Sequence, residues 1–345
     1  VEILKEELLP AMGCTEPIAV AYAAAVAVQA LGEKPESVEV NVSANIIKNV
    51  KSVVVPCTGG LRGIGAAVCA GIVAGCPEKE LEILEEITGE QKVEMKKMLD
   101  TMPMTIRESD KEYIFDIQIK ACAGGHSGYV EIAGFHTNVI CVKKDDEIIR
   151  EKAYEEQGSS CATDRSLLTV EKIIEFADCV DVADVEEVLQ RQIDYNWAIA
   201  EEGMTGNWGA AIGKTLMEAY GNSVHNRAKA MAAAGSDARM NGCELPVVIN
   251  SGSGNQGMTT SLPVIVYAKE LNVSKEMMLR ALVVSNLITI HMKTGIGRLS
   301  AYCGAISAGC GAGAGICYLY GGRAYEISHV IVNAVAINSG VVCDG

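Results

Sequence analysis

Cysteine is the residue type in this chain with the most chemistry available to it, because thirteen cysteines occur in 345 residues. Three of them, Cys303, Cys310 and Cys317, recur every seven residues within the stretch AYCGAISAGCGAGAGICYLYGG at 301–322. On an unbroken helix they would share one face, but each step of seven would advance about 10 Å along the axis. That separation is too large for several of them to hold one compact metal site. The stretch therefore predicts at most one ligand, Cys303, which follows a polar segment and stands at a predicted helix start, while the other two are expected to fill the core.

Two further cysteines stand where a helix meets a turn. Cys343 ends an apolar run and precedes Asp344–Gly345, a position from which a thiol can meet other metal ligands, although an ordinary buried cysteine fits the pattern equally well. Cys14 lies in the break GCTEP at 13–17, ahead of a predicted helix whose N-terminus would favour the thiolate. Nucleophile, metal ligand and structural residue all remain open for Cys14. No C-x-x-C pair occurs, so spacing alone gives no zinc or ferredoxin pattern.

Two glycine-rich loops are candidates for binding a small anion. The sequence NSGSGNQG at 250–257 precedes a predicted helix and offers backbone N–H groups with the short polar side chains of Ser251, Ser253, Asn255 and Gln256. Its spacing matches neither a Rossmann nor a P-loop motif, so a carboxylate fits it better than a nucleotide. A smaller loop of the same kind precedes another predicted helix, and its candidate binding residues are Thr58, Gly59 and Gly60. For either loop alone, close helix packing explains the glycines equally well.

Histidine is scarce, with five residues in the chain. A single histidine is more often structural than catalytic, and this interpretation applies to His126 and His291. His136 is the better candidate for a base or a substrate-holding residue, because Thr137 and Asn138 form a polar group with it inside an apolar strand region. The segment SDAR at 236–239 is interpreted first as a paired structural turn, and support of a site is the alternative.

The hydrophobic pattern predicts an α+β fold in which a mixed α/β sheet lobe packs on a Gly/Ala-rich all-helical domain. Residues 1–32 are expected to form N-terminal helices that pack with the helical domain, and residues 33–155 contain alternating segments typical of strands. A polar linker is expected at 154–166. Residues 160–345 are helical in pattern almost to the end and would carry the metal site.

Composition excludes several classes of function. A net charge of −15 without a basic run argues against nucleic-acid binding and against docking on an anionic membrane surface. The charge-free stretches are Ala/Gly-rich and interrupted by polar residues, so buried helices explain them better than membrane spans. No signal peptide is apparent, and thirteen cysteines are then expected to be reduced thiols of a cytoplasmic protein. The Gly/Ala-rich helix faces are compatible with a homodimer.

These segments together resemble the L-cysteine desulfidase family, whose members are also known as serine-dehydratase-like proteins. The resemblance covers nearly the whole chain and rests on six motifs, which are specific in combination: GCTEP at 13–17, HTN at 136–138, SDARM at 236–240, NSGSGNQG at 250–257, RLSAxC at 298–303 and CDG at 343–345.

The resemblance implies a 4Fe–4S enzyme that converts L-cysteine to pyruvate, ammonia and sulfide without pyridoxal phosphate, and it implies kinship with the iron–sulfur L-serine dehydratases. By similarity Cys303 and Cys343 would bind the cluster. The third ligand would be Cys14, which could also act in catalysis, or a further cysteine that family members usually carry beyond CDG. His136 would be the base, and the substrate would bind to Thr58, Gly59, Gly60, Asn138, Ser251, Ser253, Asn255 and Gln256.

Two rival functions fit the same residues. An L-serine dehydratase would use the same cluster with hydroxide as the leaving group, and nothing in the sequence separates sulfur from oxygen. A non-catalytic amino-acid sensor would bind the same small amino acid and use its cysteines only as core residues. A zinc hydrolase is disfavoured, because the sequence contains neither an H-x-x-H nor a C-x-x-C pair.

Overall fold

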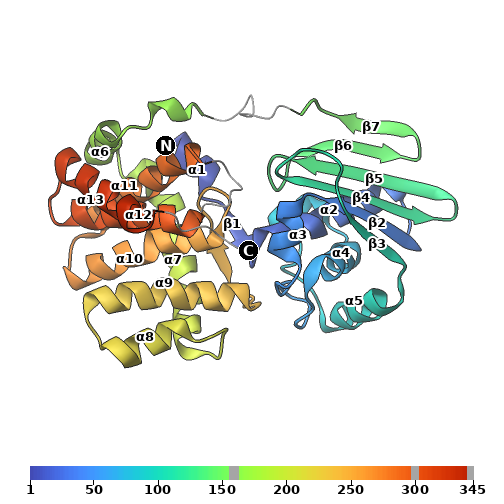
Figure 1. Cartoon of the computed structure of the whole chain (residues 1–345), viewed down its shortest axis with the longest axis horizontal. Helices are drawn as coiled ribbons and strands as arrows, with labels where there is room; N and C mark the ends of the chain where they lie inside the picture. The colour runs from blue at the N-terminus through green and yellow to red at the C-terminus, as the bar shows by residue number, and fades with distance from the viewer. Residues whose placement is uncertain (155–162, 297–302, 340–345) are drawn as a thin grey trace. The chain divides into compact units, whose positions relative to one another are not determined.

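A computed structural model describes residues 1–154, 163–296 and 303–339 (Figure 1). The expected linker at 154–166 falls largely outside these residues. The chain divides into two compact units. One unit, the helical unit, combines Val1–Pro10 with Ser160–Asp344, and the other, the sheet unit, is Ala11–Ser159. Sheet and helices are both extensive, so the predicted α+β class is confirmed.

The sheet unit is built on a six-stranded mixed sheet. Its strands lie in the order β3-β2-β4-β5-β6-β7, and all neighbours are antiparallel except β2 and β3. The strand bounds are β2 (Ser37–Val42), β3 (Met104–Glu108), β4 (Asp116–Ala123), β5 (His126–Ala133), β6 (Val139–Lys144) and β7 (Glu147–Glu151). The short strand β1 (Pro10–Met12) lies where the chain passes between the units.

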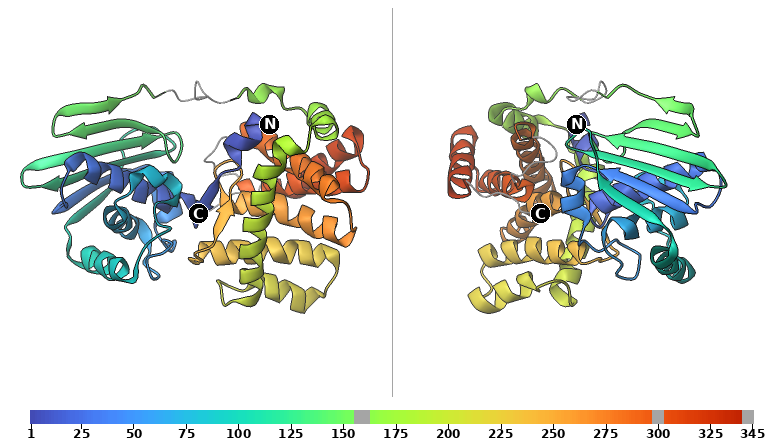
Figure 2. Two further views of the ribbon diagram at one scale, coloured as in Figure 1. Left: turned by 180° about the vertical axis from the view of Figure 1, so that it is seen from behind. Right: turned by 45° about the vertical axis from the view of Figure 1, so that its right-hand side comes forward.

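Helices cover one face of this sheet, as Figures 1 and 2 show. Their bounds are α2 (Thr15–Leu31), α3 (Ala44–Val50), α4 (Gly63–Ala74), the 3-10 helix η1 (Pro77–Glu82) and α5 (Gly89–Thr101). Two glycines allow the close packing of α2, because a Cβ atom at Gly71 would lie 1.9 Å from the carbonyl oxygen of Ala21, and one at Gly128 would lie 2.1 Å from that of Ala27. An Ala-rich helix buried against both sheet and α4 explains why so much of α2 carries no charge.

The helices of residues 1–32 were expected to pack together with the helical domain, but the structure assigns them to different units. Helix α2 belongs to the sheet unit, whereas α1 (Glu2–Glu7) belongs to the helical unit. Arg165 donates to Glu6 at 2.7 Å and to Glu7 at 2.9 Å, and this ion-pair cluster attaches α1 to the segment that precedes α6.

The helical unit packs its helices around a core of Leu, Ile, Val and Ala. Its further elements are η2 (Arg165–Leu167), α6 (Val170–Cys179), α7 (Ala183–Thr205), α8 (Ile212–Tyr220), α9 (Val224–Met240), β8 (Pro246–Val248), α10 (Gly254–Glu270), α11 (Lys275–Thr294), α12 (Gly304–Leu319) and α13 (Ala324–Ile337). Small residues bring α11 and α12 into close contact: a Cβ atom at Gly311 would lie 2.5 Å from the carbonyl oxygen of Ser285, and one at Gly315 would lie 2.9 Å from that of Ala281. None of the helices in the described ranges is long and apolar enough to span a membrane.

Candidate functional site

The glycine-rich loop at 250–253 forms a tight turn that leads directly into α10. Asn250 and Ser253 exchange backbone hydrogen bonds of 3.1 Å, and Ser251 and Gly252 between them have φ values of 50° and 83°. The left-handed backbone explains the glycine at 252. Ser253 is the N-cap residue of α10, yet its side chain does not cap the helix. The first-turn N–H groups therefore receive no cap from the Ser253 side chain, a condition that suits an anion-binding helix N-terminus.

A buried polar network fixes this loop to the helices behind it. Asn250 donates to Oδ1 of Asn286 on α11 at 2.9 Å, and Asn286 exchanges side-chain hydrogen bonds of 2.8 and 3.0 Å with Gln192 on α7. All three side chains are buried. The hydroxyl of Ser251 donates to Asn250 at 2.8 Å, so Ser251 serves the turn itself. Buried side chains that satisfy one another in this way hold a single arrangement, and the loop is pre-formed.

Arg239 lies against the N-terminus of α10. Its side chain is only 2% exposed, and Nη1 donates to Oδ1 of Asn255 at 3.1 Å. A Cβ atom at Gly254, the first residue of α10, would lie 2.3 Å from Nε of Arg239, so no larger residue fits there without displacing the guanidinium. A buried guanidinium and the positive end of a helix dipole repel each other. An anion bound beside both would relieve that repulsion, because it would be attracted to each of them.

Gln256 connects this loop to Cys303. The side chain of Gln256 is 4% exposed, and its Oε1 has no hydrogen-bond partner within the described ranges. A Cβ atom at Gly304 would lie 2.4 Å from both Cδ and Nε2 of Gln256. Gly304 is the first residue of α12, and Cys303 is its N-cap residue, as the sequence predicted. The loop, Arg239, Gln256 and Cys303 thus form one continuous constellation within the helical unit.

The cysteines of this unit differ in what they could bind. Cys303 is partly exposed and is the N-cap residue of α12, so its sulfur is accessible to a metal ion or cluster. Burial raises the pKa of Cys310 and that of Cys317, so both favour the thiol. Cys343 lies outside the described residues. Among the residues that the structure describes, no group of three or more His, Cys, Asp and Glu side chains is arranged to hold a metal ion. Cys303 is therefore available for one position of a cluster, and the described residues do not form a complete set of three ligands around it.

In the sheet unit the two motifs GCTEP and CTGG come together. A Cβ atom at Gly13 would lie 2.0 Å from Cγ of Pro56, so the break before α2 packs directly on the residue before the CTGG loop. Thr58 is buried, donates to the carbonyl of Val55 at 2.7 Å and accepts from Leu61 N–H at 3.1 Å. Its hydroxyl therefore holds the turn.

Gly59 and Gly60 have φ values of 75° and 95°, and added Cβ atoms would meet nothing within 4 Å. The backbone conformation, rather than close packing, accounts for these two glycines. The loop is exposed at both positions and presents its backbone to open space. Glycine at these positions is thus compatible with a bound ligand.

Cys14 is the N-cap residue of α2 and is 5% exposed. Its Sγ donates to Oε2 of Glu16 at 3.1 Å, and Glu16 also accepts from Asn49 at 3.4 Å. Two electrostatic influences thus oppose each other: the helix N-terminus favours the thiolate, and the neighbouring carboxylate favours the thiol.

His136 lies in the connection between β5 and β6. It is 8% exposed and packs edge to face on Phe115, with the ring centroids 4.9 Å apart. Asn138 donates to the carbonyl of Ala133 at 2.7 Å and accepts from Lys152 at 3.3 Å. Asn138 therefore closes the connection that carries His136.

The sequence alone did not identify Arg239 as a residue of the candidate site. The expectation of a turn at 236–239 is wrong, because α9 continues to Met240 and places Arg239 in its last turn. The residue signal was an arginine in an Ala-rich segment close to a glycine-rich loop. The buried amides of Gln192 and Asn286 were also missed, and their signal was polar residues at helix positions whose neighbours are apolar.

Known proteins resemble this chain along its whole length. The family model described as serine dehydratase alpha chain matches residues 78–345. The chain belongs to this family. Proteins named UPF0597 protein are 58% identical in Desulfitobacterium hafniense, over 99% of this chain and 80% of the relative, and 51% identical in Lachnoclostridium phytofermentans, over 100% and 82%. A UPF0597 protein of Treponema denticola is 44% identical over 100% of this chain and 81% of its own length.

The family match covers most of the candidate site residues but not all of them. His136, Arg239, the loop at 250–257 and Cys303 lie within the matched residues, whereas Cys14 and the loop at 58–60 precede them. The curated relatives cover Cys14 as well, since they match 99–100% of the chain.

Proposed function

We propose that this chain is a lyase that eliminates the β-substituent of a small amino acid, with L-cysteine as the first candidate substrate and pyruvate, ammonia and sulfide as products. Membership of the serine dehydratase alpha-chain family supports the reaction class. The observation that carries the proposal is the constellation at the start of α10, where a buried guanidinium lies against the helix N-terminus and Gln256 of the same helix packs on Gly304, the residue after Cys303.

The substrate carboxylate would bind at the N-terminus of α10. Backbone N–H groups after Ser253 and the guanidinium of Arg239 are both suited to a carboxylate, and the fixed position of the loop means that little ordering is required on binding. A hydrogen bond to a charged group contributes about 1.5–3 kcal/mol. Arg239 would therefore improve substrate binding by roughly 10- to 100-fold.

Gln256 would hold the other end of the amino acid. Its unpartnered Oε1 is an acceptor, and the substrate ammonium is a donor that would satisfy it. Because Gln256 packs on Gly304, a substrate bound to it would place its β-carbon near the start of α12 and Cys303.

A 4Fe–4S cluster is the proposed cofactor, with Cys303 and Cys343 as ligands and Cys14 as the third candidate. When bound, it would supply a Lewis acid that eases departure of the β-substituent. Elimination then requires loss of the Cα proton with cleavage of the Cβ–S bond, which gives aminoacrylate and sulfide. The aminoacrylate tautomerises to an imine, and water converts it to pyruvate and ammonia. We propose His136 as the residue that accepts the Cα proton.

L-serine is the second candidate substrate. The description of the matching family names serine dehydratase, and the same residues would bind either amino acid because the two differ only in the leaving group. With L-serine the Cβ–O bond breaks and no sulfide is formed.

Iron and acid-labile sulfide should be measured on protein purified without oxygen, together with sulfide release from L-cysteine and pyruvate formation from L-serine. The proposal expects iron and sulfide in equal amounts and turnover of one or both amino acids. The iron content per chain should fall in each of the single variants Cys303→Ala, Cys343→Ala and Cys14→Ala. Protein that stays free of iron after anaerobic reconstitution and turns over neither amino acid would refute it.

Arg239→Met should raise KM by about tenfold or more. The matched control is Arg280→Met, because Arg280 belongs to the same unit but contacts Glu276 and the carbonyl of Ala177. An equal KM in both variants would exclude Arg239 from substrate binding.

A further inference from the structure

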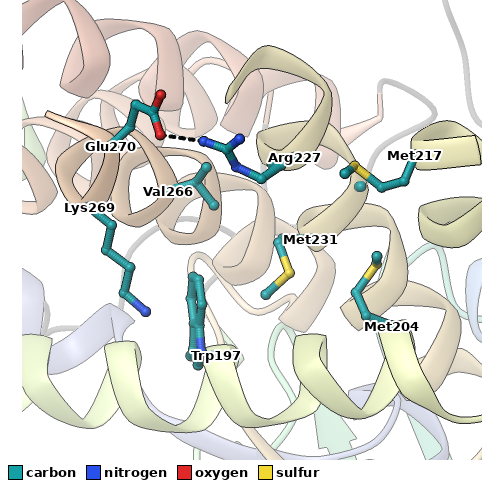
Figure 3. A pocket seen from close by; sticks show the side chains of 9 residues that line it. Trp197, Met204, Met217, Arg227, Met231, Val266, Lys269 and Glu270 are labelled. Atoms are coloured by element: carbon teal, nitrogen blue, oxygen red, sulfur yellow. Dashed lines mark hydrogen bonds and ion pairs between the residues drawn. The ribbon is translucent and has the colours of Figure 1, made fainter. Parts of the chain in front are cut away.

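A cavity lies in the helical unit, among α7, α8, α9 and α10 (Figure 3). Its volume is about 340 Å³. This volume is near the lower end of the range of about 300–1,000 Å³ that small-molecule pockets occupy. The cavity therefore suits a small molecule rather than a nucleotide.

The walls of the cavity are mainly apolar. Trp197 and Met231 face its interior, and Met204 and Met217 line the side formed by α7 and α8, as Figure 3 shows. Val266 adds a branched side chain from α10. Methionine side chains adapt to the shape of an apolar ligand, and an indole ring provides a flat face for it.

Three charged side chains stand at the edge of these walls. Arg227 forms an ion pair with Glu270, and the ammonium of Lys269 lies 3.1 Å from the centroid of the Trp197 ring. Burial lowers the pKa of Lys269, against the opposing effect of the Glu201 charge. The lining residues thus carry two cations and one anion, in a chain whose net charge is −15.

This cavity is distinct from the constellation at the start of α10. Val266, Lys269 and Glu270 belong to the C-terminal end of α10, whereas Gly254 begins the helix. Twelve residues separate Val266 from Gly254, which corresponds to about 18 Å along a helix axis. One small molecule cannot occupy both places.

We propose that this cavity is a binding site for a small apolar monocarboxylate. The aliphatic or aromatic body of the ligand lies against Trp197 and the methionines, and its carboxylate pairs with Lys269 at the edge. A partly desolvated ammonium gains from such a partner, since the ion pair restores the interactions it loses with water. The single negative charge of the ligand balances the net positive charge of the lining residues. This inference does not depend on the proposed lyase function.

Tryptophan fluorescence tests the proposal directly, because the chain has two tryptophans and only Trp197 lines the cavity. In the variant Trp208→Phe, Trp197 is the sole tryptophan. Titration with 4-methylpentanoate is expected to change its emission in a saturable way and to raise the thermal unfolding temperature. Acetate, which lacks the apolar body, and 4-methylpentanol, which lacks the charge, are expected to bind at least tenfold more weakly.

Two substitutions identify the binding site. Lys269→Met keeps an apolar stem but removes the ammonium, and it should weaken 4-methylpentanoate binding by about tenfold, since the group is partly exposed. Lys229→Met is the matched control, because Lys229 is an exposed lysine of α9 outside the cavity lining. Met231→Trp should fill the cavity and abolish the rise in unfolding temperature that 4-methylpentanoate causes, in a protein that remains folded.

The proposal is overturned if 4-methylpentanoate leaves Trp197 emission unchanged, if the alcohol binds as tightly as the acid, or if Lys269→Met and Lys229→Met bind equally. None of these results bears on iron content or on turnover of L-cysteine, so the proposed function is tested separately.

Discussion

The close packing of α12 on α11 can be tested with two glycines of the same helix. Gly311 and Gly309 are both interior residues of α12, and either change to alanine gains about 0.5–1 kcal/mol of helix propensity. Their surroundings differ. A Cβ atom at Gly311 would lie 2.0 Å from Oγ1 of Thr289 and 2.5 Å from the carbonyl oxygen of Ser285, whereas one at Gly309 meets nothing within 4 Å.

The free energy of unfolding should therefore fall in Gly311→Ala relative to Gly309→Ala. The propensity gain is common to both variants, so the difference between them isolates the cost of the contact. Overpacking of a tight core costs about 1–3 kcal/mol, and this cost should lie toward the upper end, because Ser285 presents backbone and the Thr289 hydroxyl is already bonded to Ser285 and Thr260. At about 3 °C per kcal/mol for a unit of this size, a cost of about 2–3 kcal/mol should make Gly311→Ala melt about 6–9 °C below Gly309→Ala.

Thermal unfolding followed by tryptophan fluorescence measures this difference. Both tryptophans, Trp197 and Trp208, belong to α7 or the turn after it, so the signal reports on the helical unit alone. Far-ultraviolet circular dichroism of both variants provides the control for folding at low temperature. Equal melting temperatures for the two variants would refute the inferred contact between α11 and α12.

Two further predictions concern the sheet unit. Glu16→Gln removes the carboxylate that lies 3.1 Å from Sγ of Cys14. Because this charge disfavours the thiolate, alkylation of Cys14 by iodoacetamide should become several-fold faster, as measured by mass spectrometry. An unchanged rate would mean that Glu16 does not suppress formation of the thiolate. Burial raises the pKa of Asp116, so the charged form destabilises the fold at neutral pH. Asp116→Asn should therefore raise the melting temperature at pH 7. The gain should shrink as the pH falls through the pKa of Asp116 in the folded protein toward its value near 3.8 in the unfolded chain. The control Asp110→Asn, at an exposed position, should show no such trend.

Local patterns were sufficient for much of the fold. The alternating run SVEVNV predicts the strand observed as β2, at the same bounds Ser37–Val42. A polar segment followed by a Gly/Ala-rich run predicts a helix start at Cys303, and Cys303 is the N-cap residue of α12. In both cases the signal and the structure depend on residues that are close in sequence.

Arg239 could not be placed by the same reasoning. Ser236 and Asp237 favour turns in isolation, but α9 packs on α7 and α10, and this packing keeps the helix intact through Met240. Propensity is a weak guide where tertiary contacts decide. The approach of the Arg239 guanidinium to Gly254 is likewise a property of the packed helices, and no sequence spacing encodes it.

The position of Cys303 is tied to the glycine-rich loop at 250–253 by the approach of Gln256 to Gly304. Gln256 is the third residue of α10 and Gly304 the first residue of α12, and the amide of one lies on the Cα of the other. Because the loop before α10 is held by the buried amides of Asn250 and Asn286, its position is fixed, and Gln256 transmits that position to the start of α12. Under the proposed function, carboxylate binding at the start of α10 and elimination at the start of α12 would be geometrically coupled. A side chain at position 304 would displace Gln256, and this would account for the glycine there.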